Sequence, residues 1–106
     1  MIKLTVLYGH PRDEHAFERY YADTHLPIAA KMKDVCRLEL TRFRPASDDG
    51  KPTYYRMAEI YFRDAAQLEA ALASEPGQAA IADLPNFATG GVTTLIGSVE
   101  DSRYEG

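Results

Sequence analysis

Residues 35–62 read VCRLELTRFRPASDDGKPTYYRMAEIYF and decide the fold, because they hold two strand patterns around a turn-rich segment. Apolar and polar side chains alternate along 35–44 and again along 54–62, which is the period of a β-strand. Between them, residues 45–52 contain proline, glycine, serine and aspartate, the residue types that favour turns. The stretch therefore predicts a β-hairpin with a long tip.

Both faces of this predicted hairpin carry apolar side chains. We expect helices to cover the face with Cys36, Leu38, Leu40, Ala58 and Ile60. The opposite face is expected to present Val35, Phe43, Tyr55, Met57 and Tyr61 among charged side chains. So much apolar area is unusual on a free surface, and a second copy of the chain packed sheet to sheet would bury it. The alternative is a monomer that tolerates a few exposed aromatic residues.

Strand patterns also open and close the chain, along Ile2–Tyr8 and along 92–99. After the first of them, Asp13 is the predicted N-cap of a helix. Pro27 predicts a kink or a fresh short helix, because proline lacks the N–H that a helix interior needs. The apolar stripe of this helical region, at helical spacing, consists of Phe17, Tyr20, Tyr21, Thr24 and Ile28.

A second helical region follows the hairpin. Asp64 and Gln67 stand at the N-cap and N3 positions of a capping-box-like start, and Pro76 suits the first turn of a further helix. The predicted order is β-α-β-β-α-β. This is the order of the ferredoxin-like fold, an α+β sandwich with an antiparallel four-stranded sheet and both main helices on one face. We expect residues 1–106 to form a single domain.

The composition of the chain excludes several classes of protein. Among its 106 residues Cys36 is the one cysteine, so neither an intramolecular disulfide nor a four-cysteine zinc site can form, and we expect a cytoplasmic location. No apolar run approaches the ~18 residues of a membrane span, so we expect no membrane partner. Basic residues alternate with acidic ones, and residues 64–106 hold 1 basic residue against 7 acidic residues. We therefore expect no nucleic-acid partner.

Three histidines are the groups whose ordinary pKa lies near neutrality. His10 and His15 flank a turn and His25 lies well beyond them, a spacing that predicts no shared metal site. At about 100° per residue, His25 falls on the border of the buried stripe, one turn after Tyr21. There it could donate or accept a proton, or it could cap free carbonyls at the Pro27 break. The chain has no phosphate loop or dinucleotide motif, so no cofactor is expected.

The sequence also resembles a known family. Phe17-Glu18-Arg19-Tyr20-Tyr21, followed by Thr24-His25-Leu26-Pro27-Ile28, resembles the F-x-x-Y-x…H-x-P-L motif of the EthD family. Residues 58–62, AEIYF, look like the third-strand signature of that family, and Asp83 with Phe87 resembles its later D…F pair. The resemblance extends over residues 2–99.

The resemblance implies a dimeric α+β barrel, in which two ferredoxin-like subunits pack through their sheets. It also implies that a small hydrophobic or aromatic molecule lies between the first helix and the sheet, with His25 as the catalytic acid or base. The substrate-binding residues would be Tyr8, Phe17, Tyr21 and Ile60. A lactone isomerase branch of the family uses a third-strand cysteine that this chain lacks, so lactone isomerisation by that route is not implied.

Three functions follow as alternatives. The first is a cofactor-independent enzyme of catabolism or secondary metabolism, an isomerase, cyclase or monooxygenase-like protein that uses His25. The second is an accessory protein that holds a hydrophobic intermediate for a partner oxygenase. The third is a structural dimer without a ligand. A cavity of at least ~300 Å³ beside His25 would favour the first two, and a solidly packed core would favour the third.

Overall fold

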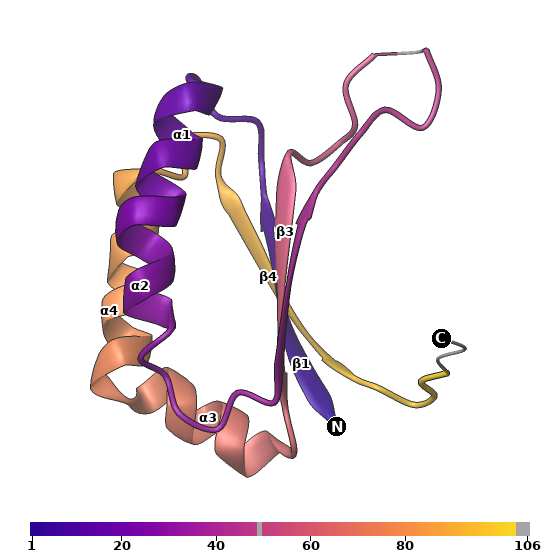
Figure 1. Ribbon diagram of the computed structural model, residues 1–106. Helices are drawn as coiled ribbons and strands as arrows, with labels where there is room; N and C mark the ends of the chain where they lie inside the picture. The colour runs from indigo at the N-terminus through magenta and orange to yellow at the C-terminus, as the bar shows by residue number, and fades with distance from the viewer. Residues whose placement is uncertain (49, 104–106) are drawn as a thin grey trace.

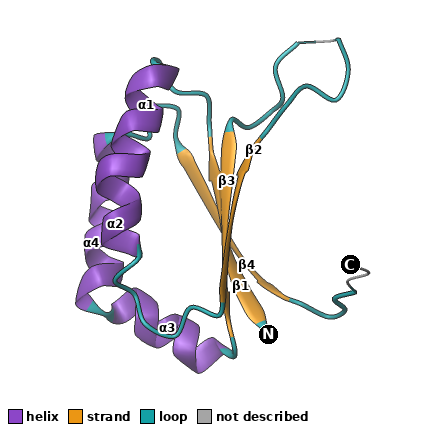
Figure 2. Ribbon diagram, viewed as in Figure 1, coloured by secondary structure: helices purple, strands orange, loops and turns teal. Residues whose placement is uncertain are grey.

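The residues described by the computed structural model, 1–48 and 50–103, form one sheet and one layer of helices. In chain order the elements are β1 (Ile2–Tyr8), α1 (Glu14–Tyr20), the π-helical turn η1 (Tyr21–His25), α2 (Leu26–Ala29), β2 (Arg37–Arg42), β3 (Arg56–Phe62), α3 (Ala65–Ala73), α4 (Glu75–Asp83), the 3-10 turn η2 (Leu84–Asn86) and β4 (Val92–Ser98). The strand order is β2-β3-β1-β4, and all neighbouring strands are antiparallel. The helices lie on one face of the sheet (Figures 1 and 2), which confirms the predicted ferredoxin-like α+β fold.

The strands agree with the sequence prediction except at their ends. β1 has the predicted bounds, whereas β2, β3 and β4 are shorter than the predicted 35–44, 54–62 and 92–99. Tyr55 lies in a bend before β3, although its N–H still donates to the Tyr8 carbonyl at 2.8 Å. The turn-rich tip between β2 and β3 projects past the sheet in Figure 1. Asp49, within the predicted tip, lies outside the described residues.

The first helical region begins as predicted and then changes its geometry. Asp13 is the N-cap of α1, and its Oδ1 accepts from the Ala16 N–H at 3.0 Å. Along η1 the Leu26 N–H donates to the Tyr21 carbonyl, five residues back, which is the hydrogen-bond pattern of a π turn. The α2 helix then carries Pro27 in its first turn, where the missing N–H is tolerated. The predicted fresh short helix near Pro27 is therefore confirmed, and it follows the π turn without a break in the helical backbone.

The π turn moves His25 away from its predicted place. A wider turn rotates less per residue than an α-helix does, so the residue four places after Tyr21 returns toward the side of Phe17. His25 is 6% exposed, and the prediction that it lies on the border of the stripe is wrong. Thr24, predicted within the stripe, is exposed for the same reason.

The second helical region begins at the predicted residues. Asp64 Oδ1 accepts from the Gln67 N–H at 2.9 Å, and Pro76 lies in the first turn of α4. The two helices of this region meet closely at Gly77, where a Cβ atom would lie 2.0 Å from the carbonyl oxygen of Ala71. Glycine is therefore required at this contact, which lets α4 fold back against α3.

The core lies between the helices and the two central strands. Its buried strand residues alternate along β1 and β3 and are Leu4, Val6, Tyr8, Ala58, Ile60 and Phe62. The helices cover the edge strand β2 less well. Its residues Leu38 and Leu40 are on the helix-facing side, yet they are 50% and 41% exposed. Cys36, just before β2, is also exposed, so its predicted place in the core is wrong.

Two residues expected on the opposite face of the sheet lie on the helix side instead. Tyr55 is buried among core aromatic residues, and Val35 packs against the same core. Both precede the regular part of a strand, where the alternation of strand side chains does not apply. The prediction was therefore wrong for these two residues.

The face of the sheet away from the helices carries a mixed surface. Met57 and Tyr61 are on this face as predicted, both half-buried, and Leu7 lies opposite Met57. Leu95 of β4 belongs to the same face and is 53% exposed. We call these four residues the open sheet face, because none of the described helices covers this side of the sheet (Figure 1). Within the described part of the chain, no helix has the length and apolar character of a membrane span.

Candidate functional site

A cavity of about 300 Å³ lies between the helix layer and the sheet. We call it the His25 cavity. Its lining residues are Leu4, Val6, Tyr8, Tyr21, His25, Leu26, Ala29, Ala30, Met32, Val35, Leu38, Leu40, Ala58, Ile60, Leu72, Gly77, Ala80, Ile81, Leu84 and Thr94. Nearly all of these are apolar, and the volume is at the lower end for sites that hold small organic ligands.

His25 is the one histidine among the described lining residues. The π turn places its imidazole against Tyr21, with ring centroids 5.9 Å apart and planes 14° apart. Phe87 contacts the same imidazole at a centroid distance of 4.6 Å. The ring is therefore held on two sides by aromatic side chains, which restricts its rotation.

A buried carboxylate orients the imidazole. The Nδ1 atom of His25 lies 3.0 Å from Oδ2 of Asp83, at the end of α4. The other carboxylate oxygen accepts from the Tyr20 hydroxyl at 2.5 Å and from the Asn86 amide at 3.0 Å. Burial opposes ionisation of Asp83, but these hydrogen bonds outweigh it and hold the pKa of Asp83 below its ordinary value.

The position of the Asp83 carboxylate decides which imidazole nitrogen can react. An ionised carboxylate only accepts hydrogen bonds, so Nδ1 of His25 carries a proton in both protonation states of the ring. Proton exchange is thereby left to Nε2, which makes no hydrogen bond to any residue that the structure describes. Carboxylate–histidine pairs of this kind hold the tautomer in which Nε2 is the base.

Two tyrosines, Tyr8 and Tyr21, line the cavity together with His25. Tyr21 is 3% exposed, and its hydroxyl has no hydrogen-bond partner among the described residues. The Tyr8 hydroxyl lies close to that of Tyr21 and lowers its pKa as a hydrogen-bonding neighbour, although the pair falls short of full hydrogen-bond geometry. Burial raises the pKa of Tyr21 to about 12 and that of Tyr8 further still. Both are therefore neutral hydrogen-bond donors at neutral pH.

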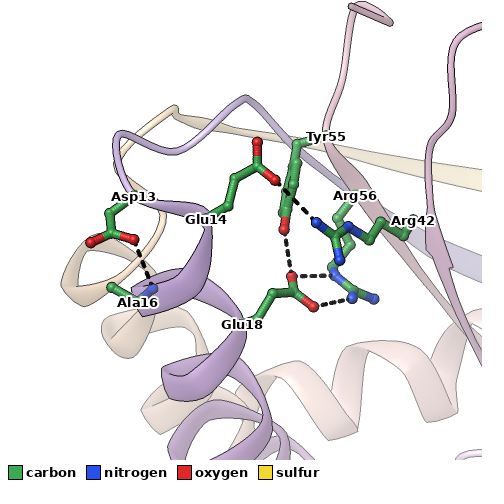
Figure 3. A network of polar contacts seen from close by, with 7 residues as sticks. All are labelled: Asp13, Glu14, Ala16, Glu18, Arg42, Tyr55 and Arg56. Atoms are coloured by element: carbon green, nitrogen blue, oxygen red, sulfur yellow. Dashed lines mark hydrogen bonds and ion pairs between the residues drawn. The ribbon is translucent and has the colours of Figure 1, made fainter.

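An ion-pair network fixes α1 to the sheet (Figure 3). Glu18 accepts from Arg56 through Nη2 at 2.5 Å and Nε at 3.1 Å, and from the Tyr55 hydroxyl at 2.8 Å. Burial disfavours ionised Glu18, but these hydrogen bonds prevail and lower the pKa of Glu18. The Arg56 guanidinium also lies 5.1 Å from the centre of the Tyr21 ring. The network thus supports one wall of the site, and its positive charge is already paired.

The structure brings together four of the five residues predicted from the sequence for this site. Tyr8, Tyr21, His25 and Ile60 line the cavity, whereas Phe17 does not. Phe17 lies one turn before Tyr21 and is enclosed by other rings, with centroids 5.4 Å from Tyr8 and 5.2 Å from Tyr55. It supports the tyrosines from behind and contributes no wall to the cavity.

Sequence reasoning did not assign Asp83 and Phe87 as contacts of His25. A usable signal was present, because Asp83 is a charged residue within the apolar stripe of Ala80 and Leu84 at the end of a helix. A carboxylate on a buried helix face needs partners. Its pairing with a histidine 58 residues away in sequence could not be read from local spacing.

The other two histidines lie outside the cavity. His15 is exposed, with Nε2 3.1 Å from Nη2 of Arg19, as expected for a solvated helix residue. His10 contacts the Pro52 carbonyl at 2.6 Å, near the hairpin tip. Among the residues that the structure describes, no cluster of three or more His, Cys, Asp or Glu side chains is arranged to hold a metal ion.

The fold and the cavity together define a ferredoxin-like α+β protein with a ligand-sized apolar site and one histidine–carboxylate pair. A family model described as the EthD domain matches residues 10–91, and the chain belongs to the EthD family. It is 38% identical, over 90% of its length and 91% of the relative, to an uncharacterised 11.0 kDa protein from the thcB–thcC intergenic region of Rhodococcus erythropolis.

Solved structures agree with this assignment. An EthD family protein from Bacillus halodurans has 33% identity and a TM-score of 0.86, covering 93% of this chain and 98% of that chain. SnoaB, a cofactor-independent oxygenase from Streptomyces nogalater, has 16% identity and a TM-score of 0.68 over 98% and 96% of the two chains. A dimeric ferredoxin-like protein of unknown function from Jannaschia has 17% identity and a TM-score of 0.68 over 93% and 100%. The last two similarities concern the fold alone.

Proposed function

We propose that this chain binds a small, largely apolar organic molecule in the His25 cavity and moves protons to and from it with His25, without a cofactor. The observation that carries the proposal is the buried Asp83–His25 pair, which leaves Nε2 of His25 without a protein partner at an apolar cavity. In this role His25 is the catalytic residue and Asp83 is a positioning residue.

The proposed reaction begins when Nε2 takes a proton from an acidic C–H or O–H bond of the substrate. The electron pair of that bond delocalises into an adjacent carbonyl or aromatic system, and the imidazolium that forms is stabilised by Asp83. Return of the proton to another atom gives an isomerisation, and attack of the carbanion within the same molecule gives a cyclisation. Attack on O₂ as a co-reactant would form a hydroperoxide, and loss of water from it would leave a ketone, which is a monooxygenase-like outcome. SnoaB, of similar fold, is named as a cofactor-independent oxygenase.

Deuterium exchange on a model ketone tests the proposal. The probe is 2-tetralone, a two-ring ketone with acidic C–H bonds beside its carbonyl, in D₂O buffer followed by NMR. Wild-type protein should accelerate exchange over buffer and His25→Ala should abolish the acceleration, while the exposed-histidine control His15→Ala should not. Binding of 2-tetralone without any acceleration would reject the catalytic role and leave the accessory role, in which the cavity only holds a ligand.

We also propose that two copies pair through the open sheet face. The support is its apolar content, with Leu95 more than half exposed and Leu7, Met57 and Tyr61 half-buried beside it. A ferredoxin-like protein of similar fold is named as dimeric. Pairing across this face would cover the side of the sheet that the helices leave open, and the His25 cavity, on the helix side, would stay free.

A further inference from the structure

We propose that Tyr20 and Asn86 are positioning residues of the His25 site: by donating to the outer oxygen of Asp83 they offset part of its charge, so that His25 stays a neutral base instead of a permanent imidazolium. This inference rests on the proposed function, for which it names the residues that set the proton affinity of the base. Neither residue lines the His25 cavity, so both act through Asp83.

A buried carboxylate beside a histidine favours the charged form of the imidazole. Asp83 is 7% exposed and His25 is 6% exposed, and Oδ2 of the first lies 3.0 Å from Nδ1 of the second. An opposite charge at this distance stabilises a protonated ring, and burial of the pair strengthens the attraction. A ring that holds its proton permanently takes none from a substrate. The site therefore needs groups that reduce the field of Asp83 and leave it ionised.

Tyr20 and Asn86 are such groups. The Tyr20 hydroxyl, from the end of α1, donates to Oδ1 of Asp83 at 2.5 Å, and the Asn86 amide, from η2, donates to the same oxygen at 3.0 Å. Tyr20 is half-buried and Asn86 is exposed, so these two neutral donors take the place that water has at a surface carboxylate. Burial raises the pKa of Asp83, and against it the Tyr20 hydrogen bond acts most strongly, followed by those of Asn86 and His25.

The Tyr20 side chain is held for this role by its ring. It stacks on Phe87 with centroids 5.3 Å apart and planes 21° apart, and Phe87 in turn contacts His25. The hydrogen bond to Asp83 raises the pKa of Tyr20, so the phenol remains a neutral donor. Tyr20→Phe keeps the stacked ring and removes only the hydroxyl, so it isolates the hydrogen bond.

Asp83 is the one charged residue that the structure describes in contact with the imidazole. The other titratable side chains that face it are Tyr21 of its own turn and Tyr8 of β1, and burial raises the pKa of both hydroxyls, so they carry no charge at neutral pH. Arg56 of β3 lies against the Tyr21 ring and is paired with Glu18. The proton affinity of the imidazole therefore depends chiefly on how far the Asp83 charge is offset.

The test is the titration of His25, followed by NMR through the Cε1–H signal of its imidazole. The signal is assigned by its absence in His25→Ala, and the exposed His15 gives a reference in every sample. The measured quantity is the pH at the midpoint of the titration, in wild type and in each variant. It does not depend on any ligand or reaction.

The variants should move this midpoint in opposite directions. Tyr20→Phe and Asn86→Ala should each raise it by about 0.5–1 pH unit, a three- to tenfold gain in proton affinity, because the Asp83 charge is less offset. Asp83→Asn should lower it, because the attracting charge is gone. The matched control is Tyr61→Phe, which removes a tyrosine hydroxyl from a carboxylate on the other side of the sheet and should leave the midpoint in place.

The exchange of 2-tetralone gives a second measurement. Because Tyr20 does not line the cavity, Tyr20→Phe should leave KM unchanged, and the rise of kcat/KM with pH should move upward by as much as the NMR midpoint. A residue that only supports the packing would move neither quantity in this direction, since looser packing admits water to Asp83 and weakens its field.

A midpoint that stays in place or falls in both Tyr20→Phe and Asn86→Ala would overturn the inference, and the proposed function would stand if wild type still accelerates exchange. Asn86 is exposed, so Asn86→Ala provides the result if Tyr20→Phe fails to fold. A midpoint that rises as expected in a protein that does not accelerate exchange would support the control of His25 by Tyr20 and Asn86 and would reject the proposed function.

Discussion

Replacing Asp83 by asparagine isolates the charge that orients the candidate catalytic histidine. Asp83 is 7% exposed and accepts hydrogen bonds from His25, Tyr20 and Asn86. Asparagine has nearly the same shape, but it offers one acceptor oxygen and an NH₂ group that donates. In Asp83→Asn the amide NH₂ therefore faces Nδ1 of His25, which loses its charged acceptor and either meets another donor or changes tautomer, so that Nε2 carries the proton.

The size of the effect follows from these contacts. A hydrogen bond to a charged group contributes about 1.5–3 kcal/mol, and a buried group left unpaired costs about 1–3 kcal/mol. The three contributions are not additive, because they share one carboxylate and ionised Asp83 has lost its hydration. We expect Asp83→Asn to lower the free energy of unfolding by about 2–4 kcal/mol at neutral pH. The matched control is Asp64→Asn, at an exposed N-cap where the two residues are about equally good, with an expected change of less than about 0.5 kcal/mol.

The pKa shift of Asp83 determines how the stability difference between wild type and Asp83→Asn changes with pH. Burial raises and hydrogen bonding lowers the pKa of Asp83, and the net result is a pKa below the ordinary value. A carboxyl group with a lowered folded-state pKa stabilises the fold above its unfolded pKa, about 3.9, and loses that contribution as the pH falls through the folded-state pKa. Urea unfolding at one protein concentration should show a gap between wild type and Asp83→Asn at neutral pH and a smaller gap below about pH 4. A gap independent of pH, or no gap beyond that of the control, would refute the reasoning.

Three further predictions test the rest of the fold. Gly77→Ala should lower the free energy of unfolding by about 1–3 kcal/mol in urea titrations, because the new Cβ would meet the Ala71 carbonyl. The control Gly97→Ala, with open space around its Cβ, should leave the free energy of unfolding nearly unchanged. Equal effects of the two substitutions would contradict the close contact at Gly77. Leu95→Glu should turn the proposed dimer into a monomer, as measured by light scattering after size exclusion. The control Ala66→Glu, on the exposed side of α3, should leave the dimer intact. A dimer that persists in Leu95→Glu would reject the open sheet face as the interface. Cys36 should react with a maleimide in the native protein about as fast as in urea, and strong protection would place the thiol in an interface or in the core.

The parts of the fold that could be predicted depend on neighbours in sequence. The alternation along β1 and β3 and the N-caps Asp13 and Asp64 are set by residues within a few positions, so periodicity and capping rules find them. The β-α-β-β-α-β order then left few arrangements of the sheet, because adjacent strands and short connections restrict the topology.

The parts that could not be predicted depend on contacts distant in sequence or on a local departure from regular geometry. An α-helical angle predicts that His25 lies at the border of the buried stripe, and the π turn that buries it has no sequence rule of its own. Tyr55 does not follow the alternation of strand side chains, because it lies in a bend one residue before β3 begins. Cys36 is exposed because the helix layer leaves the β2 edge partly uncovered, a matter of how the helices pack rather than of strand pattern. The four predicted lining residues nevertheless share one cavity, since both the helix stripe and the strand faces point to the same core.

The measurement that tests the central claim most directly is a crystal structure of the protein with 2-tetralone bound. We expect the two rings between the helix layer and Ile60, and the carbon beside the carbonyl facing Nε2 of His25. Nδ1 of His25 should remain on Asp83. A ligand bound elsewhere, or a His25 cavity closed by repacked side chains with no ligand in it, would contradict the proposed function.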